Sequence, residues 1–217
     1  MNSKEKSKII LRKLNKIYPK VPIPLNYRNT FTLLISVLLS AQCTDVNVNN
    51  VTKNIYPKYN HPKHFVKLGR KKIERLIKKI GIFRVKAKSI YFLSKTLVEK
   101  YKSKVPRTYE ELESLPGVGH KTASVVMSQA FGYPAFPVDT HIHRLAQRWG
   151  LTNGKNVVQT EKDLKKIFPK KHWNKLHLQI IWYGREYCKA RDCYGISCKI
   201  CKNCYPGRKK SIKTKKA

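Results

Sequence analysis

Acidic residues are scarce in this sequence. Only 12 of its 217 residues are Asp or Glu, against 47 Lys and Arg, and the formal net charge is therefore +35. A surface of one sign repels itself unless a polyanion balances it, which points to nucleic acid as the first candidate partner. A codon bias toward Lys, Ile, Asn and Tyr accounts for part of this excess, but few proteins without an anionic partner have a pI of about 10.2.

Long apolar runs are also missing. No stretch of about 18 apolar residues is present, which excludes a transmembrane helix and a membrane partner. The longest apolar stretch, residues 31–39, is interrupted by Thr32 and Ser36 and predicts a buried helix. The first residues lack the apolar segment and cleavage site of a signal peptide, so we expect a cytoplasmic, nucleoid-associated protein.

The alternating pattern of β-strands is almost absent, whereas helical periodicity runs through most of the chain. With 41% hydrophobic residues and only 10 Gly and 11 Pro, the chain has enough apolar side chains for a core and little to break helices. The sequence therefore predicts an all-α fold of about ten helices. The expected helices are 9–17, 31–42, 46–56, 64–80, 85–101, 109–115, 120–132, 139–149, 157–168 and 172–187.

A glycine-containing turn separates two of these helices. Between Leu115 and Ala123 the sequence reads Leu-Pro-Gly-Val-Gly-His-Lys-Thr-Ala. Gly117 and Gly119 permit a tight turn, and the amides that begin the next helix form a seat for a phosphate without any side chain. The simpler interpretation is an ordinary helical corner. The basic composition favours DNA contact, which would not depend on base sequence.

Lys121 lies in the first turn of the helix that follows. A cation there opposes the helix dipole by about 0.3–1 kcal/mol, so a purely structural lysine belongs at the other end. The same position favours a lysine that gives up its proton and acts as a nucleophile. The competing interpretation is a solvent-exposed lysine, one of many in this chain.

Asp139 and His141 follow in the segment Val-Asp-Thr-His. Asp139 precedes a predicted helix and is suited to cap it. A functional role would be a carboxylate that faces Lys121 across a cleft, moves protons and stabilises positive charge on a sugar. His141 either supports this carboxylate or packs.

Five of the six cysteines lie close together near the C-terminus, between Cys188 and Cys204. In a reducing compartment such a group indicates a metal site rather than disulfides. Cys43 stands apart and is most simply a small packing residue. Zinc held by four cysteines and an iron–sulfur cluster are both compatible with these residues.

Taken together, these motifs resemble the endonuclease III family of DNA base-excision-repair glycosylases. The resemblance runs from about residue 8 to Cys204, and the joint match is far more specific than any single motif. The segments that carry it are 38–45 (a DNA-probing loop), 115–123 (a helix-hairpin-helix), 138–141 (the catalytic aspartate segment) and 154–157.

The resemblance implies a bifunctional DNA glycosylase and abasic-site lyase that extrudes oxidised pyrimidines from the duplex. Lys121 matches the nucleophile that forms a Schiff base with the sugar, and Asp139 matches the assisting carboxylate. Strand cleavage then occurs 3′ to the abasic site by β-elimination. Gln42 matches the residue that fills the vacated space, and Ile82 stands where the family has an apolar wedge, usually leucine. His141, Gly117 and Gly119 are the remaining expected DNA-contacting residues.

The family also implies a structural [4Fe–4S] cluster bound by Cys-x6-Cys-x2-Cys-x5-Cys. Cys188, Cys198 and Cys204 match the first, third and fourth positions, but Gly195 stands at the second. Cys193 is the first choice for the missing ligand. Cys201 is the alternative, because a set of Cys188 with Cys198, Cys201 and Cys204 resembles the spacing of bacterial ferredoxins.

The resemblance further implies two lobes with DNA bound between them. We expect a helical barrel with the helix-hairpin-helix over residues 23–133. The second lobe comprises residues 1–22 and 134–208 with the cluster, followed by a disordered basic tail over 209–217. The expected partner is double-stranded DNA with damaged pyrimidines or abasic sites, bound by a monomer.

Two other functions remain open. One is the related adenine-specific mismatch glycosylase, which lacks the lysine found here at position 121. The other is a non-catalytic DNA-binding module, which would tolerate loss of Lys121 and Asp139, yet both are present.

Overall fold

The computed structural model describes residues 1–217 and is entirely helical, with eleven α-helices, one 3₁₀ helix and no strand. It divides into two compact units. The continuous unit is Pro24–Tyr133, and the terminal unit combines Met1–Ile23 with Pro134–Ala217. These limits lie within one residue of the lobes expected from the sequence, except that residues 209–217 are part of the terminal unit.

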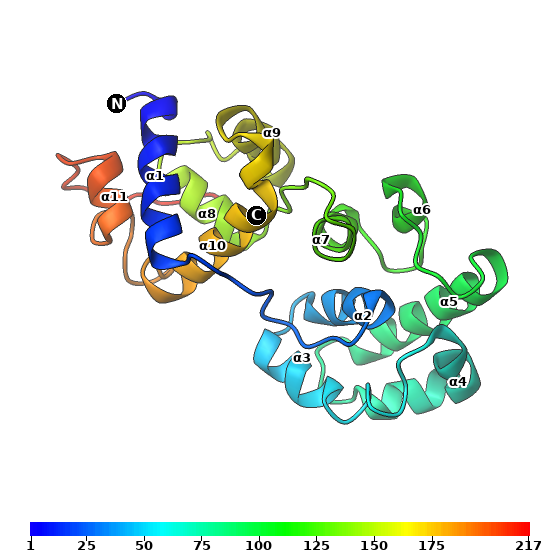
Figure 1. Ribbon diagram of the computed structural model, residues 1–217. Coiled ribbons are helices and arrows are strands. Elements are labelled where there is room, and N and C mark those ends of the chain that lie inside the picture. The colour runs from blue at the N-terminus through cyan, green and yellow to red at the C-terminus, as the bar shows by residue number, and fades with distance from the viewer. The chain divides into compact units, whose positions relative to one another are not determined.

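The continuous unit is built around its first helix, α2, which is buried on every side from residue 31 to residue 39. Helix α7 packs against α2, while α4 lies along α5 (Figure 1). The helices of this unit are α2 (Thr30–Ser40), α3 (Asp45–Thr52), α4 (Pro62–Leu76), α5 (Phe83–Lys100), α6 (Tyr109–Glu113) and α7 (His120–Phe131). Gly69 kinks α4 with a φ of 69°.

The terminal unit brings the two ends of the chain together. Helix α1 packs against α10 and α11 (Figure 1), and its inward residues Ile10 and Leu14 join a core that includes Trp149 and Leu176. The helices of this unit are α1 (Ser3–Ile17), α8 (Thr140–Arg148), α9 (Val157–Ile167), η1 (Lys170–His172), α10 (Trp173–Glu186) and α11 (Lys199–Cys204).

Helix starts follow local side-chain chemistry. Several helices begin after a residue whose side-chain oxygen accepts a backbone N–H of the first turn, a bond typical of N-caps. These residues are Asn2, Asn29, Thr44, Thr108, Asp139 and Asn156. The expected cap at Thr44 and the expected helix starts near 109, 139 and 157 are thereby confirmed, and α7 begins at His120 as expected, although its N-cap, Gly119, has no side chain.

Two features differ from the sequence-based expectations. The short helix α11 lies within the cysteine segment, where no helix was predicted. The basic tail is ordered on the terminal unit, because the amide of Ile212 donates to the carbonyl of Tyr194 and the amide of Lys215 donates to Oε1 of Gln147. None of the helices combines the length and the hydropathy that a membrane-spanning segment needs.

Candidate functional site

The turn between α6 and α7 has the geometry of a helix-hairpin-helix. Gly117 adopts a φ of 79°, and a Cβ there would lie 2.7 Å from Cβ of Ser89. Gly119 forms the N-cap of α7 without a side-chain cap, and no atom lies within 4 Å of where its Cβ would be. Gly117 is therefore required by both conformation and space, whereas Gly119 leaves the N-terminus of α7 open to an anion.

Lys121 lies in the first turn of α7, next to this open N-terminus, and its side chain is exposed. The preceding residue, His120, lies 2.8 Å through Nδ1 from Oε1 of Glu113 and stacks on the ring of Tyr109. These contacts join α6 to the start of α7. They fix the backbone that carries Lys121 while its amine faces solvent.

Asp139 is the N-cap of α8. Its Oδ1 accepts the amide of Ile142 at 2.8 Å, so the predicted capping role is present. His141 is the second residue of α8, with Nδ1 3.2 Å from Nη2 of Arg144. Arg144 also donates to the carbonyl of Gly184 on α10, which holds the start of α8 against that helix.

Gln42 and Ile82 occupy the ends of two exposed loops in the continuous unit. Gln42 has a φ of 52° and Ile82 a φ of 50°, a left-handed conformation that is unusual for any residue with a side chain and especially for a β-branched one. Ile82 is 52% exposed although its side chain is purely aliphatic. Both residues are thus presented to solvent by strained backbone, which is a frequent property of functional loops.

Lys86, which the sequence reasoning did not single out, lies beneath these loops. Its Nζ donates to the carbonyls of Leu39 at 2.9 Å and Ala41 at 2.5 Å. Helical spacing offered a signal for it, because Lys86 shares the inward face of α5 with the apolar side chains of Ile90, Leu93 and Leu97. Lysine is almost never fully buried unless it is paired, so a lysine at a position that the helical spacing predicts to be buried can be noticed in the sequence.

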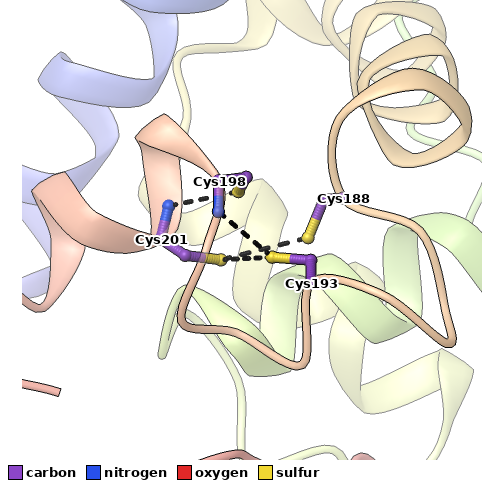
Figure 2. Close-up of side chains that lie close together, drawn as sticks. All are labelled: Cys188, Cys193, Cys198 and Cys201. Carbon is purple, nitrogen blue, oxygen red and sulfur yellow. Dashed lines mark hydrogen bonds between the residues drawn. The ribbon is translucent and has the colours of Figure 1, made fainter. Parts of the chain in front are cut away.

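Four of the five clustered cysteines converge. The Sγ atoms of Cys188, Cys193, Cys198 and Cys201 all lie within 4.8 Å of one another, and all four residues are buried (Figure 2). None of the cysteines forms a disulfide. Four buried thiols at non-bonded distance form a donor set that soft metals prefer, so these residues fit an iron–sulfur centre chemically.

Cys204, which the family pattern places among the ligands, is not part of this group. Residues 199–204 form α11, and Cys204 lies three residues beyond Cys201, about 4.5 Å farther along a helix axis. It lines a surface hollow with Tyr205 and Arg208 instead. Burial raises the pKa of its thiol to about 11, which keeps it neutral. The structure therefore differs from the expected set, in which Cys204 was a member and Cys193 and Cys201 were alternatives.

Positive charge and N–H groups surround the four sulfurs. Arg148 is 2% exposed and donates through Nη1 to Sγ of Cys188 at 3.3 Å and to the carbonyl of Lys189 at 2.8 Å. The amide of Cys201 donates to Sγ of Cys198 at 3.5 Å. Hydrogen bonds from the thiols of Cys188 and Cys201 lower the pKa of Cys198. The surroundings thus favour thiolate, the form that binds a metal, at Cys198, while hydrogen bonds to Cys198 raise the pKa of Cys188, and hydrogen bonds to Cys188 and Cys198 raise the pKa of Cys201.

Comparison with known proteins identifies the architecture. A family model described as "HhH-GPD superfamily base excision DNA repair protein" matches residues 35–170. Endonuclease III of Bacillus subtilis (strain 168) is 42% identical over 204 residues, which cover 94% of this chain and 93% of that protein. Endonuclease III of Escherichia coli (strain K12) is 42% identical over 198 residues, covering 91% and 94%. The chain belongs to the endonuclease III family.

Solved structures agree with the endonuclease III assignment. A trapped endonuclease III–DNA covalent intermediate matches with a TM-score of 0.87 and 43% identity, covering 92% of this chain and 94% of that one. A thermostable thymine-DNA glycosylase matches with a TM-score of 0.78 at 24% identity, which shows the shared fold. Endonuclease III proteins are DNA glycosylase/lyases. The predicted all-α glycosylase fold and the predicted bifunctional DNA glycosylase and abasic-site lyase of base excision repair are therefore confirmed.

Proposed function

We propose that this protein removes oxidised pyrimidines from duplex DNA and cleaves the strand 3′ to the resulting abasic site, with Lys121 as the nucleophile. The observation that carries the proposal is the place of Lys121, whose exposed amine lies in the first turn of α7 beside the open hairpin. The similar solved complex is a trapped covalent intermediate with DNA, as attack by an amine on the sugar requires.

In the proposed reaction the neutral Nζ of Lys121 attacks C1′ of the damaged nucleotide. The glycosidic bond breaks, and the base leaves with its bonding electrons and takes up a proton. Ring opening then gives an iminium ion between Nζ and C1′. Loss of a proton from C2′ breaks the C3′–O bond, and water finally releases the lysine.

Asp139 is the proposed assisting carboxylate of the same reaction. Its negative charge stabilises the positive charge that develops on the sugar as the base departs, and it accepts a proton during the later steps. The hydrogen bond from the amide of Ile142 to Oδ1 fixes the orientation of the group. His141 would support it through Arg144, which lies 3.2 Å from Nδ1 of His141.

DNA binding is assigned to the hairpin and the two strained loops. The amides at Gly117 and Gly119 would hold backbone phosphate at the start of α7. Gln42 would pair with the base left without a partner, and Ile82 would wedge into the stack and keep it open. The exposure of both side chains is what these roles need.

Borohydride trapping tests the nucleophile. The protein is incubated with a duplex that contains one abasic site, and borohydride is added to reduce any Schiff base to a stable covalent adduct. We expect an adduct with the wild-type protein and none with Lys121→Ala, while the two bind DNA with nearly equal affinity. Lys155→Ala is the matched control, an exposed lysine on the terminal unit that should retain the adduct. An adduct of undiminished yield with Lys121→Ala would overturn the assignment.

The cysteine group is the proposed site of a structural [4Fe–4S] cluster, bound by Cys188, Cys193, Cys198 and Cys201. When bound, the cluster would cross-link the segment that follows α10 to α11 and supply no step of the base-removal chemistry. The basic side chains of this segment, among them Lys189, Arg191 and Lys199, are exposed and would then be held toward DNA phosphates.

Matched cysteine variants test the ligand set. We expect Cys201→Ser to lose bound iron, inorganic sulfide and visible absorbance, whereas Cys204→Ala retains all three. The wild-type protein is analysed for zinc in parallel. Iron loss in Cys204→Ala with retention in Cys201→Ser would overturn the set, and one zinc per chain without sulfide would overturn the cluster.

A further inference from the structure

One buried lysine connects the two loops that carry Gln42 and Ile82. The Nζ of Lys86 donates to the carbonyls of Leu39 and Ala41, at the end of α2 and directly before Gln42. The backbone amide of the same residue donates to the carbonyl of Ile82 at 3.2 Å. Lys86 therefore bonds to one loop through its side chain and to the other through its main chain.

Stability of the fold alone does not account for a lysine here. Lys86 is 4% exposed, and both acceptors of its ammonium group are neutral carbonyls rather than carboxylates. Removal of a cation from water is costly, and an apolar side chain of similar length on this face would avoid that cost. Burial accordingly lowers the pKa of Lys86. What the lysine provides is two directed bonds to the end of α2, where a cation also complements the helix dipole.

The loops that it joins are strained and in close contact. The left-handed backbone of Gln42 and Ile82 persists only where surrounding bonds enforce it. Gly81 lies so near the first loop that a Cβ there would be 3.3 Å from the carbonyl oxygen of Gln42. A second bond connects the same region, from Nδ2 of Asn47 to the carbonyl of Lys79 at 2.9 Å.

We propose that Lys86 is a positioning residue that holds Gln42 and Ile82 in one fixed arrangement, so that both side chains enter the duplex together. The inference rests on the proposed function of these two residues. Gln42 must fill the space of the extruded base while Ile82 wedges into the base stack. The reaction is faster if this arrangement exists before DNA binds, because a displacement of about 1 Å can lower a rate by about 100-fold. Lys86 is not expected to touch DNA itself.

The test separates opening of the duplex from chemistry at the sugar. Lys86→Met keeps the apolar stem and removes the ammonium group. Two rates are measured under single-turnover conditions with saturating enzyme: excision of an oxidised pyrimidine from a duplex, and cleavage of a single-stranded oligonucleotide that already contains an abasic site. We expect duplex excision to fall at least tenfold and single-strand cleavage to change less than twofold. Lys88→Met, an exposed lysine on the same helix, should alter neither rate.

A double-mutant cycle decides whether Lys86 acts through the two loops. In a Gln42→Ala/Ile82→Ala background, Lys86→Met should have little further effect, whereas a general structural role would leave its effect unchanged. Asn47→Ala, which removes the bond from α3 to the carbonyl of Lys79 shortly before Ile82, should give a smaller loss of the same kind and serves as the test if Lys86→Met does not fold.

The positioning role would be overturned if folded Lys86→Met excised the base from duplex DNA at the wild-type rate. It would also be overturned if the variant lost equal factors in rate on both substrates. A wild-type protein that acts on neither substrate would instead overturn the proposed function.

Discussion

Asp139 combines a structural and a proposed chemical role, and substitution can separate them. Asparagine caps helices about as well as aspartate but carries no charge. We expect Asp139→Asn to keep the melting temperature and to lower the rate of base excision by about 100-fold or more. Asp139→Ala should in addition lose about 0.5–2 kcal/mol of unfolding free energy, because the bond to the amide of Ile142 is gone.

Thermal unfolding and single-turnover excision, measured on the same preparations, distinguish the two roles. A wild-type excision rate for Asp139→Asn would restrict this residue to capping α8.

Substitution of the two hairpin glycines by alanine is expected to lower the unfolding free energy by unequal amounts. In Gly117→Ala the new Cβ would meet Ser89 at 2.7 Å and the backbone φ is 79°, so we expect a loss of about 1–3 kcal/mol of unfolding free energy. Gly119→Ala places its methyl in open space, and only the modest preference for glycine over alanine at an N-cap is lost. Urea unfolding of both variants checks the order, and equal losses would contradict it.

Single residues also show where sequence reasoning succeeded and where it failed. Local patterns sufficed for Asp139 and for Gly117, because a cap and a tight turn are determined within a few residues. The position of Cys204 could not be read from spacing, because the helix that displaces it depends on packing of the terminal core. Lys86 had a local signal, but its acceptors lie 45 and 47 residues away.

Packing of α8 against α9 is expected to weaken in acid. His143 on α8 is 1% exposed and lies 2.8 Å through Nδ1 from Oγ1 of Thr160 on α9. Burial lowers its pKa below the ordinary value of 6.5. Below about pH 6.5 the unfolded chain takes up a proton that the folded chain resists, so this contribution is complete above pH 6.5 and is lost as the pH falls through the folded value.

Unfolding free energies at several pH values between 7.5 and 5 check this sign. His143→Gln should flatten part of the decline, since glutamine has no proton to gain in this range. A pH dependence unchanged by the substitution would assign the decline to other groups.

Most elements were predictable because their signals are periodic. Ten predicted helices have counterparts, and their starts at Thr44 and Asp139 were marked by capping residues. Helix α11 was not predicted because its six residues are too few to show a period, and its cysteines, Cys201 and Cys204, were assigned with Cys198 to a metal site. The kink of α4 at Gly69 was likewise invisible, since the apolar spacing continues on both sides.

For the whole molecule, a charge of +35 predicts that DNA affinity depends steeply on salt. The logarithm of the association constant should fall by about 0.9 per logarithmic unit of salt for each phosphate contacted. Fluorescence anisotropy with an undamaged duplex between about 50 and 200 mM salt measures this slope. Removal of residues 209–217, which include five lysines, should make the slope shallower, and a flat response of the full chain would contradict the electrostatic interpretation.

The terminal unit has a consequence for how the protein is made. Helix α1 is synthesised before the other helices of this chain, yet the helices against which it packs, α10 and α11, are synthesised after all the others. The continuous unit can complete its core once residue 133 has been synthesised. Helix α1 cannot pack against α10 and α11 until some seventy further residues have been added, which takes several seconds of translation. The cysteines between Cys188 and Cys204 are synthesised at the end of that interval. We therefore expect metal insertion and packing of the terminal core to occur at nearly the same time. Under the proposed cluster assignment, chains synthesised without iron would have a complete continuous unit and a terminal unit that is still open to proteases.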